Sequence, residues 1–338
     1  MRYFLTSARS SSLRQEETSP SSDPGRVLEA VARDRLGQRS TRPSPAALWI
    51  DHHFKWLMVA PAILIIVMIT LYPLLFSLWV AFINYDFSVP GHAFVGLGNF
   101  RRIVTDPVAI SSTVTTLWLS VVNVALEFVL GLMLALAMVK TFRGRSAVMT
   151  ILIIPLFISP VIVGQFWALL LQRPFGPTNY LLGKLVGHEV TISWLTEKPW
   201  NFMAIIAADV WQWTPFTFVL LLAGLTSIPP HIYEAAELDG VNAWTAFWDL
   251  TLPHLAPMIL LALTFRLLDA VKIFDVIFML TGGGPGTGTY TLSYYLYQIG
   301  FQQFHISQAT AGSWLFLVVL TVMIMALVQR LLRPEAVR

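Results

Sequence analysis

The sequence predicts an all-α polytopic membrane protein with six transmembrane helices. Of its 338 residues, 56% are hydrophobic and only 12% are charged, whereas soluble domains carry about 25% charged residues. Apolar runs of about 20 residues, the length that crosses a bilayer, recur along the chain after residue 55. The sequence contains no cysteine, which excludes disulfides, thiolate catalysis and cysteine-based metal sites. No metal site is predicted.

Residues 1–55 differ in composition from the rest of the chain. They are rich in Ser, Arg and Pro, carry nine Lys and Arg residues, and contain no apolar run that fits a cleavable signal peptide. We expect a disordered, basic cytoplasmic tail that helps to set orientation. A regulatory or lipid-contacting role for this tail is the alternative.

The transmembrane domain is predicted to cover residues 56–333. Its six apolar segments are separated by polar, turn-rich loops. They are expected at about 56–82, 113–139, 147–171, 202–225, 257–280 and 307–332.

The distribution of Lys and Arg predicts the orientation of these spans. With the N-terminus inside, 15 of these residues fall in the cytoplasmic segments and five in the external loops, while two lie within the fifth span. Cytoplasmic loops carry an excess of Lys and Arg. Both termini are therefore predicted to be cytoplasmic, as is the loop at about 228–254 between the fourth and fifth spans.

That loop contains the segment Glu234–Pro253, EAAELDGVNAWTAFWDLTLP. Its first residues favour helix, and Gly240 allows the left-handed backbone that ends a helix at low cost. Residues 241–250 are expected to form a second short helix, punctuated by Pro253. The prediction is a helix, a turn and a second helix outside the membrane.

Ionisable residues inside the spans are candidate site residues because they are costly in a membrane. Glu127 lies in the second span and Asp209 in the fourth, while Arg266, Asp269 and Lys272 follow each other at intervals of three in the fifth. Asp269 can pair with these cations along the helix, and Glu127 can serve the other cation from a neighbouring helix. An ion-pair network that only orients the helices is the alternative.

The fourth span also carries a mixed polar and aromatic face. Asp209, Gln212, Trp213 and Phe216 fall on one side of a helix. Directional hydrogen-bonding groups beside aromatic rings suit a carbohydrate, whose hydroxyls need partners and whose apolar face stacks on rings. Pro215 leaves a backbone carbonyl free nearby, as expected where a helix lines a cavity. An aromatic packing face is the alternative.

The loop after the fourth span resembles the "EAA" loop of permease subunits of bacterial ABC importers. The matching positions are Glu234, Ala235, Ala236, Asp239, Gly240, Phe247, Leu252 and Pro253. The fifth-span runs FRLLDA and KIFD, followed by LTGGGP, are similar to those of maltose-type carbohydrate-uptake permeases. The resemblance covers residues 55–333 and implies the type I importer transmembrane fold.

In that family the loop is a coupling helix that docks on an ATPase subunit. The resemblance therefore assigns ATPase coupling to Glu234, Ala235, Ala236, Asp239, Gly240 and Phe247. It places substrate contacts in the fourth and fifth spans, at Asp209, Gln212, Trp213, Phe216, Arg266, Asp269, Ala270 and, by extension of the charged row, Lys272. Side chains at most of these positions differ from those of the maltose permease, so the particular sugar stays open.

The resemblance further implies a transport subunit of the bacterial inner membrane rather than an enzyme. Its partners would be a second homologous permease in a heterodimer, two ATPase subunits and an external sugar-binding protein. ATP would bind to the ATPase, this chain would bind no cofactor of its own, and no nucleic acid is implied. The glycine-rich run Thr281–Gly286 lacks the Lys-Ser/Thr ending of a P-loop.

Two other functions stay open at this point. An ion-coupled secondary carrier could relay protons through Glu127, Asp209 and Asp269. An ABC importer of an anionic sugar derivative could use Arg266 and Lys272 to bind the anion. Because Asp269 and Asp275 offset both cations, the sequence favours a neutral mono- or oligosaccharide or polyol.

Overall fold

The computed structural model describes residues 29, 45–85, 91–173 and 175–331. The tail expected to be disordered lies outside the described residues, apart from Glu29 and the residues from 45 onward. Within the described residues the secondary structure is helical, with one isolated antiparallel bridge between Ile83 and Phe94. Residues from Thr70 onward form the compact unit that contains the site.

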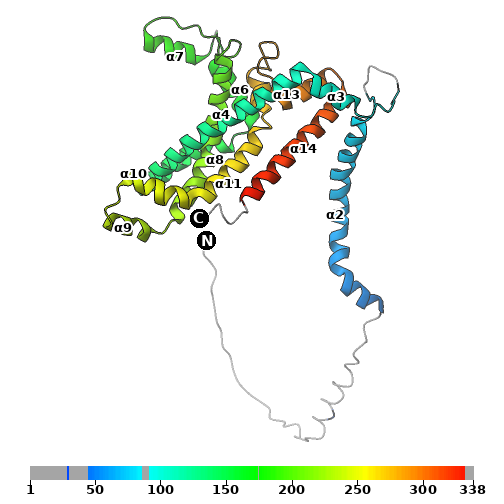
Figure 1. The fold of residues 1–338 in the computed structure, drawn as a ribbon, viewed down its shortest axis with the longest axis horizontal. Helices are drawn as coiled ribbons and strands as arrows, with labels where there is room; N and C mark the ends of the chain where they lie inside the picture. The colour runs from blue at the N-terminus through cyan, green and yellow to red at the C-terminus, as the bar shows by residue number, and fades with distance from the viewer. Residues whose placement is uncertain (1–28, 30–44, 86–90, 174, 332–338) are drawn as a thin grey trace, which may run out of the picture. The chain divides into compact units, whose positions relative to one another are not determined.

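The chain runs through helices that are labelled in Figure 1. They are α2 (Pro45–Ala81), α3 (Gly98–Thr105), α4 (Pro107–Met138), α5 (Arg145–Ile153), η1 (Ile154–Phe157), α6 (Pro160–Leu171), α7 (Pro177–Val186), α8 (Trp200–Ser227), α9 (Pro230–Leu238), α10 (Ala243–Ala246), η2 (Phe247–Thr251), α11 (Leu252–Ala270), α12 (Asp275–Leu280), α13 (Leu292–Tyr297), η3 (Gln298–Gln302) and α14 (Ile306–Leu331).

Five helices in the described chain are long and apolar enough to cross a membrane, and a bent pair brings the number to six. The pair is the third predicted span, in which residues 145–157 and 160–171 meet at 100°. Ile158 and Ser159 are extended at the bend. Because the residue before a proline avoids the helical region, Pro160 both ends the first helix and starts the second. The described chain thus has five such helices, or six if the bent pair is one broken span, which is close to the six predicted.

The fifth predicted span differs from the expectation of one helix over 257–280. Helix α11 ends at Ala270, the chain turns, and the separate short helix α12 begins at Asp275. Helix α12 packs against α6, and Gly164 of α6 allows this close approach because a Cβ there would lie 2.7 Å from the Met279 Cβ. This tertiary contact explains why a continuous apolar run does not form a continuous helix.

At its other end the fifth span reaches further than predicted. Helical structure continues from Ala243 to Ala270, so Pro253 does not punctuate the loop helix as expected. Pro253 lies in the first turn of α11, directly after the π-helical turn η2 (Phe247–Thr251). A missing N–H is tolerated in the first turn of a helix, and the π turn supplies the change of register.

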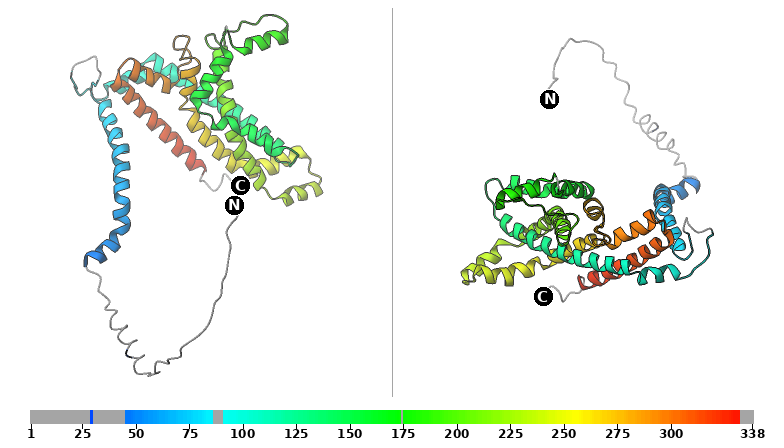
Figure 2. Two further views of the ribbon diagram at one scale, coloured as in Figure 1. Left: turned by 180° about the vertical axis from the view of Figure 1, so that it is seen from behind. Right: turned by 90° about the horizontal axis from the view of Figure 1, so that it is seen from above.

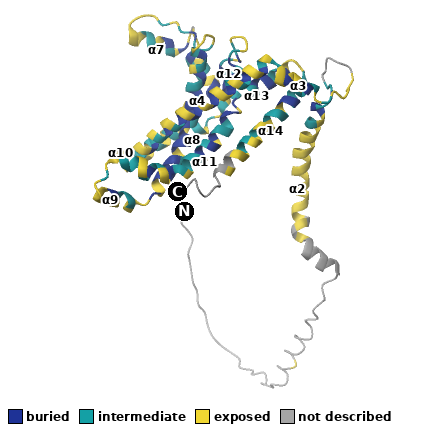
Figure 3. Ribbon diagram, viewed as in Figure 1, coloured by how far each residue is buried: buried dark blue, intermediate teal, exposed yellow. Residues whose placement is uncertain are grey.

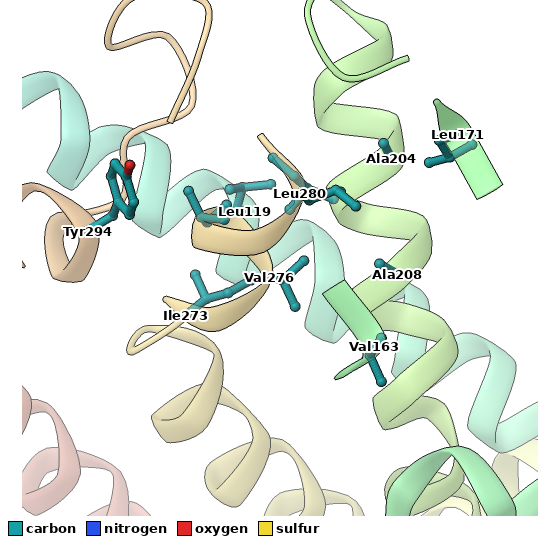
Figure 4. Close-up of a cluster of buried hydrophobic side chains, with 11 residues drawn as sticks. Leu119, Val163, Leu171, Ala204, Ala208, Ile273, Val276, Leu280 and Tyr294 are labelled. Atoms are coloured by element: carbon teal, nitrogen blue, oxygen red, sulfur yellow. The ribbon is translucent and has the colours of Figure 1, made fainter. Parts of the chain in front are cut away.

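Helices α4, α8 and α11 form the centre of the compact unit, with α4 and α8 packed along each other. The buried residues concentrate on these helices and on α12 and α13 (Figure 3). One buried cluster joins α4, α6, α8, α12 and α13 and includes Leu119, Val163, Ala204, Ala208 and Val276 (Figure 4). A second cluster surrounds Phe218 and Leu255 where α8 and α11 approach the α9–α10 loop.

The two ends of the compact unit carry different loops. Helices α9 and α10 lie at one end, while α7, α12 and α13 lie at the opposite end (Figures 1 and 2). At the second end Asp106 caps α4 by accepting hydrogen bonds from Val108 N and Ala109 N. The Tyr295 hydroxyl donates to Asp106 Oδ2 at 2.8 Å. Burial and this carboxylate raise the pKa of Tyr295, so the hydroxyl stays a donor.

Gly131 sets the distance between α4 and α8. A Cβ at this position would lie 3.0 Å from the backbone nitrogen of Phe218 and from the Thr217 Cβ. We expect Gly131→Ala to cost about 1–3 kcal/mol through overpacking and to lower the thermal midpoint of the purified protein by several degrees. Gly98→Ala is the matched control, since its nearest neighbour would be 3.7 Å away. Equal midpoints for the two variants would contradict this packing.

Candidate functional site

Arg266 of α11 joins three helices through its guanidinium group. Its Nε donates to Glu127 Oε2 at 2.5 Å and its Nη2 to Glu127 Oε1 at 2.8 Å, a two-pronged pair with α4. The same Nη2 donates to Asp209 Oδ2 of α8 at 2.5 Å. Nη1 donates to Asp269 Oδ2 at 3.3 Å. The expected pairing of Glu127 with a fifth-span cation is therefore present.

The face of the guanidinium is occupied as well as its edges. Its central carbon lies 5.0 Å from the centre of the Trp213 ring, a cation–π contact. Asn123 of α4 donates from Nδ2 to Asp209 Oδ2 at 2.7 Å. The Glu127, Asp209 and Arg266 side chains are each at most 4% exposed. Arg266 is thus held by carboxylates at its edges and by an aromatic ring on one face.

A small cavity of about 130 Å³ opens beside this network. Its walls come from α6, α8, α11, the turn after α11 and the start of α12. They are Pro160, Asp209, Trp213, Arg266, Asp269, Ala270, Lys272, Ile273, Phe274, Asp275 and Val276. Six of the eight positions predicted to contact substrate line this cavity, Ala270 among them.

Asp269 and Lys272 form the more exposed part of the cavity wall. Their side chains are 45% and 57% exposed, and Lys272 Nζ lies 3.9 Å from Asp269 Oδ1. Lys272 stands in the turn after α11, because the helix ends at Ala270. The cavity therefore has a buried, tightly bonded wall at Arg266 and a more exposed, loosely paired wall at Asp269 and Lys272.

The other two predicted residues, Gln212 and Phe216, do not line the cavity. Gln212 is 1% exposed and donates from Nε2 to the Ile158 carbonyl at 2.9 Å. This bond attaches α8 to the bend of the third span. It satisfies the Ile158 carbonyl, which loses its intrahelical partner at the break. Phe216 is half-buried one turn further along α8. Whether either residue contacts a substrate stays a prediction.

The structure also brings in residues that the sequence reasoning missed. Asn123 is fully buried against Asp209, and it lies one helical turn before Glu127 on the same face of α4. That spacing could have identified Asn123 as a candidate site residue from the sequence. Pro160 and Phe274 reach the cavity only because α6 and α12 fold back toward α8. No sequence pattern near these two residues predicts that α6 and α12 fold back toward α8.

The α9–α10 loop has the predicted helix, turn and helix. Gly240 has φ +73°, Val241 N donates to Ala236 O and Gly240 N donates to Glu237 O. This pair of bonds is the Schellman ending, which needs a left-handed residue at the position of Gly240. Asn242 then caps α10 by accepting from Thr245 N at 2.9 Å.

Large apolar side chains of this loop are exposed. Leu238 is 90% exposed, Trp244 is 71% exposed and Trp248 is 48% exposed. Glu234, Ala235 and Asp239 are exposed with them, while Ala236 is buried and Phe247 half-buried. The Tyr233 and Thr251 hydroxyls lie 3.0 Å apart and join α9 to the start of α11. The loop is thus held at its base, and its outer face is uncovered in this chain.

With this geometry in hand, comparisons with known proteins identify the family. Residues 127–334 match the family described as "Binding-protein-dependent transport system inner membrane component". The match includes Glu127, Asp209, Arg266 and the whole α9–α10 loop. The chain belongs to this family. The resemblance predicted from the loop motif is confirmed, and the protein is a permease subunit of the ABC transporter class.

Individual relatives agree with this assignment. The chain is 39% identical over 279 residues to a probable ABC transporter permease protein y4oQ of Sinorhizobium fredii, covering 82% of this chain and 89% of the relative. It is 35% identical over 258 residues to the trehalose/maltose transport system permease protein MalF of Thermococcus litoralis, covering 76% and 85%.

A solved structure supports the fold of this permease. The chain is similar, with a TM-score of 0.71 and 28% identity, to a chain of a bacterial alginate ABC transporter solved in complex with an alginate-bound periplasmic protein. The similarity covers 82% of this chain and 94% of that one. The predicted ABC importer transmembrane fold is therefore confirmed.

The structure predicts that substituting Arg266 destabilises the fold far more than substituting Lys272 of the exposed pair beside it. Arg266→Leu removes the cation that pairs with Glu127 and Asp209 and leaves buried negative charge unpaired, which costs about 3–5 kcal/mol. We expect the variant to lose most of its folded yield in size-exclusion chromatography. The same substitution combined with Glu127→Gln and Asp209→Asn is expected to recover that yield, because no charge is then left unpaired.

Lys272→Leu serves as the control, because an exposed ion pair contributes at most about 1 kcal/mol. Its yield should stay close to that of the unaltered protein. If Arg266→Leu alone accumulated as well as the triple variant, the buried ion pairs would not be what holds α4, α8 and α11 together.

Proposed function

We propose that this permease is the membrane-spanning subunit of an ATP-driven, binding-protein-dependent carbohydrate importer. It forms half of the translocation pathway and contacts an ATPase subunit through the Glu234–Pro253 loop. The observation that carries the proposal is the α9–α10 turn, which presents exposed Leu238 and Trp244 at the end of the unit opposite α7 and α13. Trp244 and the exposed Trp248 are contiguous, with ring centres 5.7 Å apart, and contiguous exposed apolar side chains mark sites of protein contact.

The loop is suited to transmit motion to the cavity. Helical structure continues from Ala243 to Ala270, so Trp244 and Arg266 lie on one helical run. At a rise of 1.5 Å per residue, about 33 Å of helix separates them. A push on the loop by the ATPase would move α11 and, with it, the wall of the cavity. Glu234, Ala235, Ala236, Asp239, Gly240 and Phe247 are the proposed coupling residues.

A carbohydrate is the substrate class that the cavity and the relatives support together. One relative is named for transport of trehalose and maltose, and a similar solved structure is that of a bacterial ABC transporter involved in the import of the acidic polysaccharide alginate. The cavity offers a tryptophan and a phenylalanine beside hydrogen-bonding side chains, which is the pairing that a sugar ring needs. The proposed substrate-binding residues are Asp209, Gln212, Trp213, Phe216, Arg266, Asp269 and Lys272.

The charges around the cavity favour a neutral sugar or polyol over an anionic one. Three carboxylates, of Asp209, Asp269 and Asp275, and two cations, Arg266 and Lys272, line it. Arg266 is held by carboxylates, and Lys272 lies close to Asp269. The carboxylates that line the cavity thus outnumber its cations by three to two. The ion-coupled carrier is disfavoured because the chain belongs to a family of ABC transporter subunits.

The size of the cavity supports a second permease in the proposed assembly. A volume of about 130 Å³ is below the 300–1,000 Å³ typical of ligand pockets, so a second homologous permease would complete the site. Two ATPase subunits would bind the α9–α10 loops of the two permeases, and ATP would bind to them alone. An external sugar-binding protein would deliver the substrate. Both termini would lie in the cytoplasm of a bacterial cell, inside its inner membrane.

The coupling role predicts a loss of transport without a loss of folding. Leu238→Asp is expected to abolish ATP-driven sugar uptake into proteoliposomes, because it places a charge in the apolar contact with the ATPase. Leu238 is 90% exposed in this chain, so insertion and thermal midpoint should not change. Glu234→Lys is expected to act in the same way. Leu238→Asp should also release the ATPase subunit when the complex is purified. The control is Leu185→Asp, on an 83% exposed residue of α7, which should leave the ATPase bound. Loss of the ATPase from both variants would refute this placement of the interface.

The neutral-sugar assignment predicts that transport does not need the positive charge of Lys272. Lys272→Gln should keep uptake within about threefold of the unaltered importer, and phosphorylated sugars should compete poorly with their neutral counterparts in the same assay. A loss of tenfold or more, about 1.4 kcal/mol of binding, together with strong competition by the phosphorylated sugars, would favour an anionic substrate instead.

A further inference from the structure

The buried ionisable groups of α4, α8 and α11 do not balance in charge. Among the described residues, Arg266 is the cation of this set and Glu127 and Asp209 are its carboxylates, all at most 4% exposed. With both carboxylates ionised the set has a charge of −1. Lys272 does not offset it, because Lys272 lies beside Asp269, a half-exposed carboxylate that also contacts Arg266, and these two residues add no net charge. An uncompensated charge is strongly disfavoured at such burial.

Hydrogen bonds distinguish the two carboxyl groups. Both oxygens of Glu127 accept from Arg266, which is the fork-on-fork geometry of an ionised carboxylate. Asp209 uses Oδ2 alone, and this one oxygen accepts from both Arg266 and Asn123. Within the described part of the chain no hydrogen bond reaches Asp209 Oδ1. Asp209 also lines the cavity, so a proton on Oδ1 would displace no existing bond.

Asn123 adds an independent observation. It is 1% exposed, its Nδ2 donates to Asp209, and its Oδ1 is buried with no donor among the described residues. A buried acceptor without a donor is costly. The surroundings of Asp209 therefore hold more acceptors than donors, and one additional proton would remove the excess negative charge.

We propose that the Glu127–Asp209 pair binds one proton from the solvent and that Asp209 faces the cavity as a neutral carboxylic acid. Proton binding brings the charge of the buried set to zero without breaking any bond to Arg266. The charged and titratable groups that face the pair from the surrounding elements are Arg266 and Asp269 of α11, Lys272 of the following turn and Asp275 of α12.

The neutral acid has a consequence for recognition that rests on the proposed function. A carboxylic acid presents both an O–H donor and an acceptor, whereas a carboxylate only accepts. A sugar hydroxyl that enters the cavity could then accept from Asp209 as well as donate to it. Proton binding itself does not depend on the identity of the substrate.

Infrared difference spectroscopy of the assembled transporter in lipid tests the proposal. At pH 7 the unaltered protein should show a protonated-carboxyl C=O band that shifts in D₂O. Asp209→Asn should remove the band. Glu127→Gln should remove it too, because Asp209 would then be the sole buried partner of Arg266 and would ionise. Asp249→Asn, which alters an exposed aspartate of the α9–α10 loop, should keep the band.

The absence of the band in the unaltered protein would overturn the proposal, and so would its persistence in Asp209→Asn. A second measurement uses the unaltered protein alone, so it does not depend on whether a variant folds. The folded protein keeps a proton that an unfolded aspartate, with its pKa near 3.9, has released, so the thermal midpoint of the unaltered protein should fall as pH rises above 5. A pH-independent midpoint would also overturn the proposal. An importer of another solute would still show the band, so failure of the sugar assignment is distinguishable.

Discussion

The pairing of Arg266 with Glu127 and Asp209 is the interaction on which the rest of the structure depends. The partners lie 139 and 57 residues from Arg266 in the sequence, on three different helices. A charge in a membrane must be paired, so these helices can pack in one arrangement that satisfies all three groups. The cavity exists beside this pairing because Trp213 and Asp209 are held in place by it.

The α9–α10 loop and the cavity lie at the two ends of one helical element. The helical run from Ala243 to Ala270 begins in the exposed loop and ends where the cavity begins. The Schellman ending at Gly240 and the contact of Tyr233 with Thr251 hold the loop on this helix. A movement imposed on the loop therefore reaches Arg266 through packed helix rather than through flexible chain.

Much of this arrangement was predictable from the sequence, and the reasons are physical. Long apolar runs predicted the spans, and the cost of charge in a membrane singled out Glu127, Asp209 and Arg266 before any contact was known. Gly240 predicted the turn, which has the expected positive φ. The break after Ala270 was not predictable, because α12 leaves the line of α11 to pack on α6, a contact made by residues distant in the sequence. The role of Gln212 escaped for the same reason, since its partner is a carbonyl freed by the bend of another span.

The central claim is that this chain acts as one permease subunit of an ATP-driven complex. Intact-complex mass spectrometry after purification from native membranes in mild detergent tests it most directly. The account predicts recovery with one other permease-sized chain and two copies of an ATPase. Recovery of the chain alone, or only with further copies of itself, would contradict the account and would leave the exposed face of the α9–α10 loop without the partner that we assign to it.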